Sequence, residues 1–231
     1  VTGVQTCALP ILYFKKGMYL SLNEKLKQVL KVPVITAGRM DNPDLASDAI
    51  SQNKTDMIAL GRPLLADAYI PEKIKQDKLE NIRPCLSCHD GCMGRLALGG
   101  GLSCAVNPST GREKEFQLQP ATKIKNVLII GGGVAGCEAA RVCAIRGHKV
   151  SLYEKTDKLG GNIIPGGVPD FKEDDRALVQ WYYNELKQNN VDIHFNTTVT
   201  EELISKLNCD VIIVATGSKR SEERRVGKEC M

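Results

Sequence analysis

In the first part of the chain, apolar and polar residues follow two patterns, the spacing of an amphipathic helix and the short apolar run of a strand. Apolar residues recur at helical spacing within residues 21–31, on one face formed by Leu22, Leu26, Val29 and Leu30. A short apolar run and a helical pattern come next, and the same pair then repeats. We expect strands at 32–38 and 57–61, a helix at 44–53 and a helical stretch ending near residue 75. Strands that alternate with helices at this interval predict βα units of a parallel sheet.

The same alternation returns after residue 125. We expect strands at 126–131, 149–154, 191–195 and 210–217, with helices at 134–146 and 174–189. Between the two periodic regions, residues 81–120 contain four cysteines and many glycines but little periodicity. We therefore expect a loop-rich segment that something other than an apolar core holds together.

The two ends of the chain call for a separate interpretation. The letters VTGVQTCALPI at the start and RSEERRVGKEC at the end resemble translated sequencing-adapter read-through. Irregular natural termini are the alternative. Under the adapter interpretation, Cys7 and Cys230 are excluded, and seven of the nine cysteines remain. The expected divisions are adapter-like residues 1–12, a barrel end 13–80, a cysteine segment 81–120, a dinucleotide-binding unit 121–219 and adapter-like residues 220–231.

The composition of the chain excludes only a few classes of function. The 231 residues are 42% hydrophobic and 25% charged, which is ordinary for a globular protein, and the net charge of +4 is scattered. Nucleic-acid binding would need a basic block, and a membrane span would need about 20 consecutive apolar residues. We expect neither partner, and we expect a cytoplasmic protein.

The four cysteines of the central segment form the most informative pattern. Cys85, Cys88, Cys92 and Cys104 are separated by two, three and eleven residues. This spacing suits a cubane iron–sulfur cluster, in which four irons each take one thiolate. Zinc is the competing interpretation, although structural zinc usually shows two closely spaced cysteine pairs. Disulfides are a third, but nothing marks the chain as secreted. His89 is expected to be a neighbour of the site and not a ligand.

Two consecutive strands end in Gly-Arg, at Gly38-Arg39 and Gly61-Arg62. In (β/α)₈ barrels the loops after strands seven and eight commonly bind a phosphate group. Glycine lets a phosphate oxygen approach backbone N–H groups, and arginine adds a charged contact. Two tight turns with solvated arginines are the alternative reading.

A dinucleotide fingerprint follows the apolar run at 126–130. Gly131, Gly133 and Gly136 form G-x-G-x-x-G at the start of the expected helix, and Glu154 ends the next expected strand. The glycines allow a pyrophosphate to approach the helix N-terminus, and the acidic residue can accept hydrogen bonds from a ribose. A glycine-rich turn without a ligand is the alternative.

These motifs together resemble one family of iron–sulfur flavoproteins. The segments IRPCLSCHDGC, SCAVNP, GGGVAG, YEK with LGG, and VIIVATGS are similar to those of 2-enoate and 2,4-dienoyl-CoA reductases. The flavin barrel of that family is related to Old Yellow Enzyme and trimethylamine dehydrogenase. The resemblance implies an α/β protein with the last two βα units of a (β/α)₈ FMN barrel, a [4Fe-4S] segment and an incomplete Rossmann-like FAD domain.

The resemblance also implies roles for particular residues. Gly38, Arg39, Gly61 and Arg62 match FMN phosphate loops, and the four cysteines match cluster ligands. The FAD site, which holds only ADP in some relatives, is matched by Gly131, Gly133, Gly136, Glu154, Gly160, Gly161, Ala215, Thr216 and Gly217.

The implied reaction passes electrons from NAD(P)H through FAD, the cluster and FMN to an activated C=C bond of an enoate or enoyl thioester. An amine dehydrogenase of the trimethylamine type and a zinc-stabilised nucleotide-binding module are the alternatives. A complete barrel needs about 250 residues, so the alkene pocket is expected to lie upstream, and no catalytic residue can be named. Homo-oligomerisation of the full-length protein is left open.

Overall fold

The structure is a computed structural model that describes residues 11–218. Residues 1–10 and 219–231 lie outside the described residues, and so does most of the sequence that we interpret as adapter-derived. Residues 11–13 form a short 3₁₀ turn. Within residues 11–218, no helix combines the length and apolar character needed to cross a bilayer.

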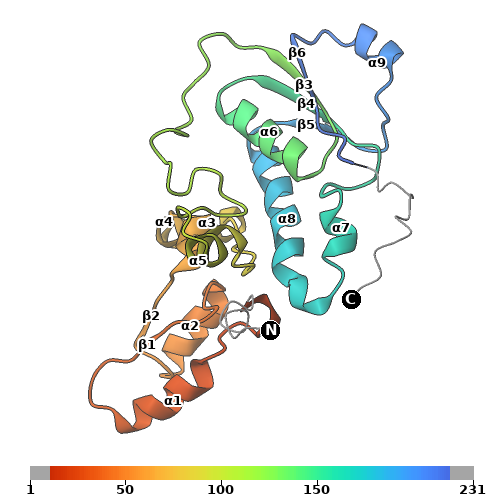
Figure 1. Cartoon of the computed structure of the whole chain (residues 1–231). Helices are drawn as coiled ribbons and strands as arrows, with labels where there is room; N and C mark the ends of the chain where they lie inside the picture. Colours follow the sequence, from red (N-terminus) through yellow and green to blue (C-terminus); the bar gives the residue numbers. More distant parts are fainter. Residues whose placement is uncertain (1–10, 219–231) are drawn as a thin grey trace.

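The N-terminal unit alternates helices and strands as predicted. Strands β1 and β2 run parallel, with Thr36 opposite Ile58. Asn42 caps the second helix, because its side-chain oxygen accepts a hydrogen bond from the N–H of Leu45 at 2.9 Å. The elements in chain order are α1 (Leu20–Val29), β1 (Ile35–Thr36), α2 (Pro43–Ser51), β2 (Met57–Ile58), α3 (Arg62–Ala66) and α4 (Ile70–Lys75) (Figure 1).

The strands of this unit are shorter than the sequence indicates, and part of its apolar surface is not buried. Each strand spans two residues, whereas the pattern predicted seven and five. Helix α1 forms, but Leu22 on its apolar face is 56% exposed, and Ile35 of β1 is 55% exposed. A two-stranded sheet is too small to bury such a face by itself. Nothing among the described residues covers this surface.

The cysteine segment is irregular, as predicted. It begins with η2 (Leu79–Asn81), followed by an extended stretch, a π-helical turn η3 (Asp90–Gly94) and one turn of helix α5 (Arg95–Ala97). From residue 98 to residue 125 the chain has neither helix nor strand, and it crosses as a long loop to the C-terminal unit (Figure 1).

The C-terminal unit is built on a four-stranded parallel sheet of order β5-β4-β3-β6. Ile129 of β3 lies opposite Leu152 of β4 and Ile213 of β6, so β3 is central. Helices α6 and α8 pack against each other beside the sheet (Figure 1). The elements are β3 (Asn126–Ile130), α6 (Val134–Ile145), β4 (Lys149–Tyr153), α7 (Ile163–Gly166), η4 (Asp170–Lys172), α8 (Glu173–Gln188), β5 (Asp192–His194), α9 (Glu201–Lys206) and β6 (Val211–Val214).

One apolar core joins the C-terminal unit to the cysteine segment. Ile129, Leu152 and Leu186 have no exposed surface. Val106 belongs to the same cluster, and Cys85, Leu86 and Cys104 pack against it. Of the three described cysteines outside the cysteine segment, Cys137 is buried, whereas Cys143 and Cys209 are only half-buried. The cysteine segment is therefore anchored to the core of the C-terminal unit.

Candidate functional site

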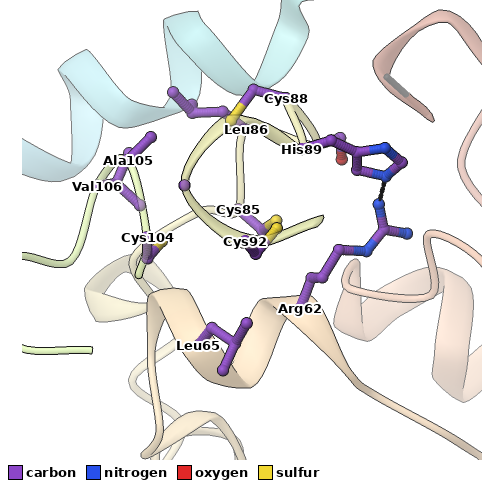
Figure 2. A pocket seen from close by; sticks show the side chains of 12 residues that line it. Arg62, Leu65, Cys85, Leu86, Cys88, His89, Cys92, Cys104, Ala105 and Val106 are labelled. Atoms are coloured by element: carbon purple, nitrogen blue, oxygen red, sulfur yellow. Dashed lines mark hydrogen bonds between the residues drawn. The ribbon is translucent and has the colours of Figure 1, made fainter. Parts of the chain in front are cut away.

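The four cysteines line one pocket, as Figure 2 shows. Cys85, Cys88 and Cys92 come from a single tight loop, and Cys104 comes from a second loop. Helix α3 forms the opposite wall through Arg62 and Leu65. A pocket with four thiols thus lies where the end of the N-terminal unit meets the cysteine segment.

Gly91 brings the two cysteine loops together. A Cβ atom at this position would lie 3.0 Å from the Cα of Cys104 and from the N of Ala105. The N–H and the hydroxyl of Ser103 both donate to the carbonyl of Gly91, at 3.0 and 2.7 Å. Only glycine allows the two backbones to approach this closely.

The first cysteine loop is shaped by two residues in the left-handed region. Ser87 has φ of 54° and His89 has φ of 63°. Residues other than glycine rarely adopt this conformation, and it tends to persist where the surroundings enforce it. Here the carbonyl of His89 accepts a hydrogen bond from the N–H of Gly94 at 2.7 Å. The loop is thus held by its own backbone.

Burial dominates the electrostatics of the thiols. It raises the pKa of Cys85 to about 11, against a smaller lowering by a backbone hydrogen bond from Ser87. Burial also raises the pKa of Cys88 above its ordinary value. Within residues 11–218, no three His, Cys, Asp or Glu side chains converge in the way that ligands of a single metal ion do. The thiols surround a space and do not meet at one point.

The two Gly-Arg turns lie at the same edge of the two-stranded sheet, but their arginines have different partners. Arg39 is buried, and its guanidinium donates to Asp174 at 2.7 Å and to Glu173 at 3.1 Å. Arg62 instead contacts Nε2 of His89, as Figure 2 shows. The predicted phosphate role of these arginines therefore stays a prediction, and Arg39 already has two carboxylate partners.

The Asp174 carboxylate joins all three parts of the chain. It accepts hydrogen bonds from Arg39 of the N-terminal unit and, at 3.5 Å, from Ser87 of the cysteine loop. It also pairs with Lys16 at 3.0 Å, while Asp41 pairs with the same ammonium group. Burial alone would lower the pKa of Lys16, but these two carboxylates raise it. No local pattern of residues indicated this junction, because its members are far apart in the chain.

In the turn after β3, Gly131 and Gly136 must be glycine because a side chain at either position would collide with the protein's own backbone. A Cβ atom at Gly136 would lie 1.9 Å from the carbonyl oxygen of Gly131. Gly131 has φ of 109°, and a Cβ atom there would lie 2.4 Å from the carbonyl oxygen of Ala215. These contacts press β3, the start of α6 and the end of β6 together.

Gly133 is different, because nothing lies within 4 Å of the position of its Cβ atom. Its φ of −71° is open to any residue. The Gly160-Gly161 turn lies beside it, since Gly133 and Gly160 form a β-bridge and Gly161 would place a Cβ atom 3.1 Å from the Cα of Gly133. Gly217, with φ of 72°, and the neighbouring Thr216 lie exposed after β6. The structure thus brings Gly131, Gly133, Gly136, Gly160 and Gly161 together at the start of α6.

Glu154 is 7% exposed at the end of β4. It accepts hydrogen bonds from the N–H of Gly132 at 2.6 Å and from the N–H and hydroxyl of Thr156, both at 2.9 Å. Burial would raise the pKa of Glu154, but these donors hold it below its ordinary value. The sequence reasoning missed Gly132 and Thr156, although the middle glycine of GGG could have indicated that its N–H faces the acidic residue.

Comparisons with known proteins support one family. The model of the NADH:flavin oxidoreductase / NADH oxidase family matches residues 12–81, and that of FAD dependent oxidoreductases matches residues 126–213. A cinnamate reductase from Clostridium sporogenes is 63% identical over 90% of this chain and 31% of its own length. An NADH oxidase from Thermoanaerobacter brockii is 37% identical over 94% of this chain and 34% of its own length.

Solved structures point the same way. A 2-naphthoyl-CoA reductase in complex with 2-naphthoyl-CoA is similar over 92% of this chain and 33% of its own, with a TM-score of 0.89 and 32% identity. The chain thus spans about a third of the length of these relatives. We conclude that the chain belongs to the 2-enoate reductase family of flavin oxidoreductases.

Proposed function

We propose that this chain is the cofactor-bearing middle of an NAD(P)H-dependent reductase of activated C=C bonds. In this proposal residues 13–80 complete an FMN barrel, residues 81–120 bind a [4Fe-4S] cluster, and residues 121–219 form a Rossmann-like FAD site. The observation that carries the proposal is the pocket lined by the four cysteines, between helix α3 and the core of the C-terminal unit.

The donor set fits a four-iron cluster better than a single zinc ion. Zinc would draw four sulfur atoms to about 2.3 Å from one point. A cubane attaches each thiolate to a different iron, so its ligands surround a larger body. The four cysteines line a common space without converging on one point, which supports the cluster. The buried Nδ1 of His89 has no partner among the described residues, as expected beside a site that a further group would fill.

The glycine-rich turn fits an adenine dinucleotide. Gly131 and Gly136 serve the protein's own packing, whereas the space beside Gly133 is free of protein atoms at the start of α6. A pyrophosphate at that helix N-terminus would be stabilised by backbone N–H groups. Glu154 keeps a negative charge near neutral pH, and this suits hydrogen bonds from a ribose hydroxyl. We propose FAD here, or ADP as in some relatives.

Fewer residues support the proposed FMN site. Gly61 is exposed at the start of α3 and has no atoms within 4 Å of its Cβ position, so the space beside this glycine is open. By the register of β1 and β2, Gly38-Arg39 lies at the same edge. We propose that the backbone of both turns holds the FMN phosphate, and that Arg39 contributes by bracing its turn through Asp174.

Flavins supply hydride or single-electron chemistry, and a cluster passes single electrons between them. The residues of this chain would hold these groups in series, and the shared core would exclude water from the cysteine pocket. The substrate class follows from the relatives, whose names include a cinnamate reductase and a 2-naphthoyl-CoA reductase. A dimethylamine dehydrogenase is also similar, but at 30% identity against 63% for the cinnamate reductase, so we favour enoate or enoyl-thioester reduction.

Iron analysis after anaerobic reconstitution of the 231-residue chain tests the proposal. We expect about four irons per chain and a brown colour, and Cys85→Ser or Cys104→Ser should remove both. The matched controls are Cys143→Ser and Cys209→Ser, two half-buried cysteines outside the pocket that should keep the iron. One zinc ion per chain without iron would show instead a structural zinc module.

A further inference from the structure

Two contacts tie the second cysteine loop to the first, one on each side of Cys104. Before this cysteine, Ser103 donates two hydrogen bonds to the carbonyl of Gly91. After it, the guanidinium of Arg83 donates to the carbonyl of Val106 at 2.9 Å. Arg83 lies just before the first cysteine loop and Gly91 lies near its end, so the two contacts join opposite ends of that loop to the residues that flank Cys104.

Arg83 is held through both its backbone and its side chain. Its N–H donates to the carboxylate of Asp67, at the end of α3, at 2.9 Å. Its guanidinium lies over the indole ring of Trp181 in α8, 4.4 Å from the ring centroid. The indole is held in turn, because its N–H donates to the carbonyl of Asn81 at 2.9 Å. A planar guanidinium can stack on an aromatic ring and still donate from its edge, which an ammonium group cannot do in the same way.

The charge of Arg83 is balanced within the protein. The residue is 7% exposed, and Glu138 of α6 lies 4.0 Å from its guanidinium. Glu138 also pairs with Arg141 at 2.7 Å, and Arg141 lies 3.9 Å from Glu185. Burial and the Arg141 cation lower the pKa of Arg83, but an arginine stays charged in proteins. Two cations thus face two carboxylates, and the position of Arg83 is explained by the protein's own residues.

We infer that Arg83 is a positioning residue that sets where Cys104 lies relative to the three cysteines of the first loop. The inference rests on the proposed function, because the separation of the loops matters only if all four thiolates bind one cluster. Three of the thiolates come from one tight loop, whereas the fourth depends on how two loops are held together (Figure 2). Arg83 acts on this fourth ligand through the backbone of Val106, as partners behind metal ligands commonly do.

Loss of this contact should affect one corner of the cluster and leave the other three corners held. A cubane whose fourth thiolate is poorly held can lose the iron at that corner on oxidation. With ferricyanide as the one-electron oxidant, the oxidised four-iron cluster releases one Fe²⁺ and gives one electron to ferricyanide. The three-iron cluster that remains has an electron paramagnetic resonance signal, whereas the oxidised four-iron cluster has none.

The test compares Arg83→Met with Arg141→Met after anaerobic reconstitution and brief treatment with ferricyanide. Both variants remove a buried arginine that faces Trp181, but the described hydrogen bonds of the Arg141 side chain all go to Glu138. We expect both variants to lose stability in urea unfolding. Only Arg83→Met should fall from about four irons per chain to about three and gain the three-iron signal.

Arg83→Lys provides a graded variant, because it keeps the charge and one donor but not the stacked fork. We expect its three-iron signal to appear more slowly than in Arg83→Met and faster than in the unmodified chain. If Arg83→Met does not fold, this variant decides the question. A rate in Arg83→Lys equal to that of the unmodified chain would then overturn the inference.

The other outcomes separate the inference from the proposed function. Four irons without a three-iron signal in folded Arg83→Met would overturn the inference and leave the cluster assignment intact. Equal loss of iron in Arg83→Met and Arg141→Met would also overturn it, because the buried charge and not the contact with Val106 would then hold the fourth ligand. An unmodified chain that takes up no iron would overturn the proposed function as well.

Discussion

The N-terminal and C-terminal units share the same alternation of strands and helices, but they differ in strand length and in how far their apolar residues are buried. In the C-terminal unit, strands of three to five residues form a parallel sheet in which Ile129 and Leu152 are completely buried. In the N-terminal unit the strands have two residues, and Leu22 and Ile35 are more than half exposed. The C-terminal unit contains most of the apolar core, whereas the N-terminal unit is joined to it through Ala66 of α3, which belongs to that core, and through ion pairs such as Arg39–Asp174.

The spacing of apolar residues thus predicts where helices and strands form, but it does not predict which other parts of the protein cover their apolar faces. Both units have apolar positions at the correct spacing. Only the C-terminal unit has enough strands, with helices packed against them, to bury a core, and sheets below three strands rarely hold together alone. The N-terminal unit therefore depends on its contacts with the rest of the chain, above all the buried junction at Asp174.

The largest change in the free energy of unfolding is expected for Gly136→Ala in the C-terminal unit. Its added methyl group would overlap the carbonyl oxygen of Gly131, and backbone cannot move aside cheaply. We expect a loss of about 3 kcal/mol or more in the free energy of unfolding. Thermal denaturation followed by circular dichroism measures it. A melting temperature equal to that of the unmodified chain would show that the turn is looser than described.

The next largest loss of stability is expected at the buried junction of Asp174, which links the N-terminal unit to the rest of the chain. Asp174→Asn removes the carboxylate that Arg39 and Lys16 share. Glu173 and Asp41 remain, so we expect a local loss of about 3 kcal/mol, at the low end for a broken buried pair. Hydrogen exchange should quicken in α2 but not in β3.

The control for the junction is Asp175→Asn, which alters only the pair with Lys172 at 3.6 Å. Equal protection of α2 in the Asp174 variant and in this control would mean that the N-terminal unit is held by contacts other than the junction.

A smaller effect, on binding alone, is expected for Gly133→Val. Because no protein atom lies near its Cβ position, stability should change little, but the side chain would occupy the space of a pyrophosphate. We expect ADP affinity to fall at least about tenfold, or about 1.4 kcal/mol. Calorimetry with ADP measures this, and unchanged affinity in a folded variant would exclude the site.

The smallest effect is expected on the exposed helix of the N-terminal unit. Leu22→Ala should change stability by less than about 0.5 kcal/mol, because the side chain already contacts water. Leu152→Ala, its buried counterpart, should cost about 2 to 5 kcal/mol. Urea unfolding of both variants compares the two, and equal losses would show that the face of α1 is covered in solution.

Much of this arrangement could be predicted from local signals. The spacing of the cysteines indicated a shared site, and the strand–glycine–helix order indicated a glycine turn between β3 and α6. That Gly131 and Gly136 are needed for packing against the protein's own backbone was not indicated. The partners of Arg39 could not be predicted, because Asp174 lies 135 residues away and no periodicity links them. The orientation of Arg62 was equally hidden, since it depends on a histidine ring carried by another loop.

The junction at Asp174 also has a consequence for the order of events during synthesis. A ribosome releases the barrel end and the cysteine loop before it has made α8, and domains generally fold from the N-terminus onward. Arg39 and Ser87 must then wait for a carboxylate that is translated much later. The proposed insertion of iron into the cysteine loop is accordingly expected to follow translation of α8, so a nascent chain stalled before that helix should emerge without metal.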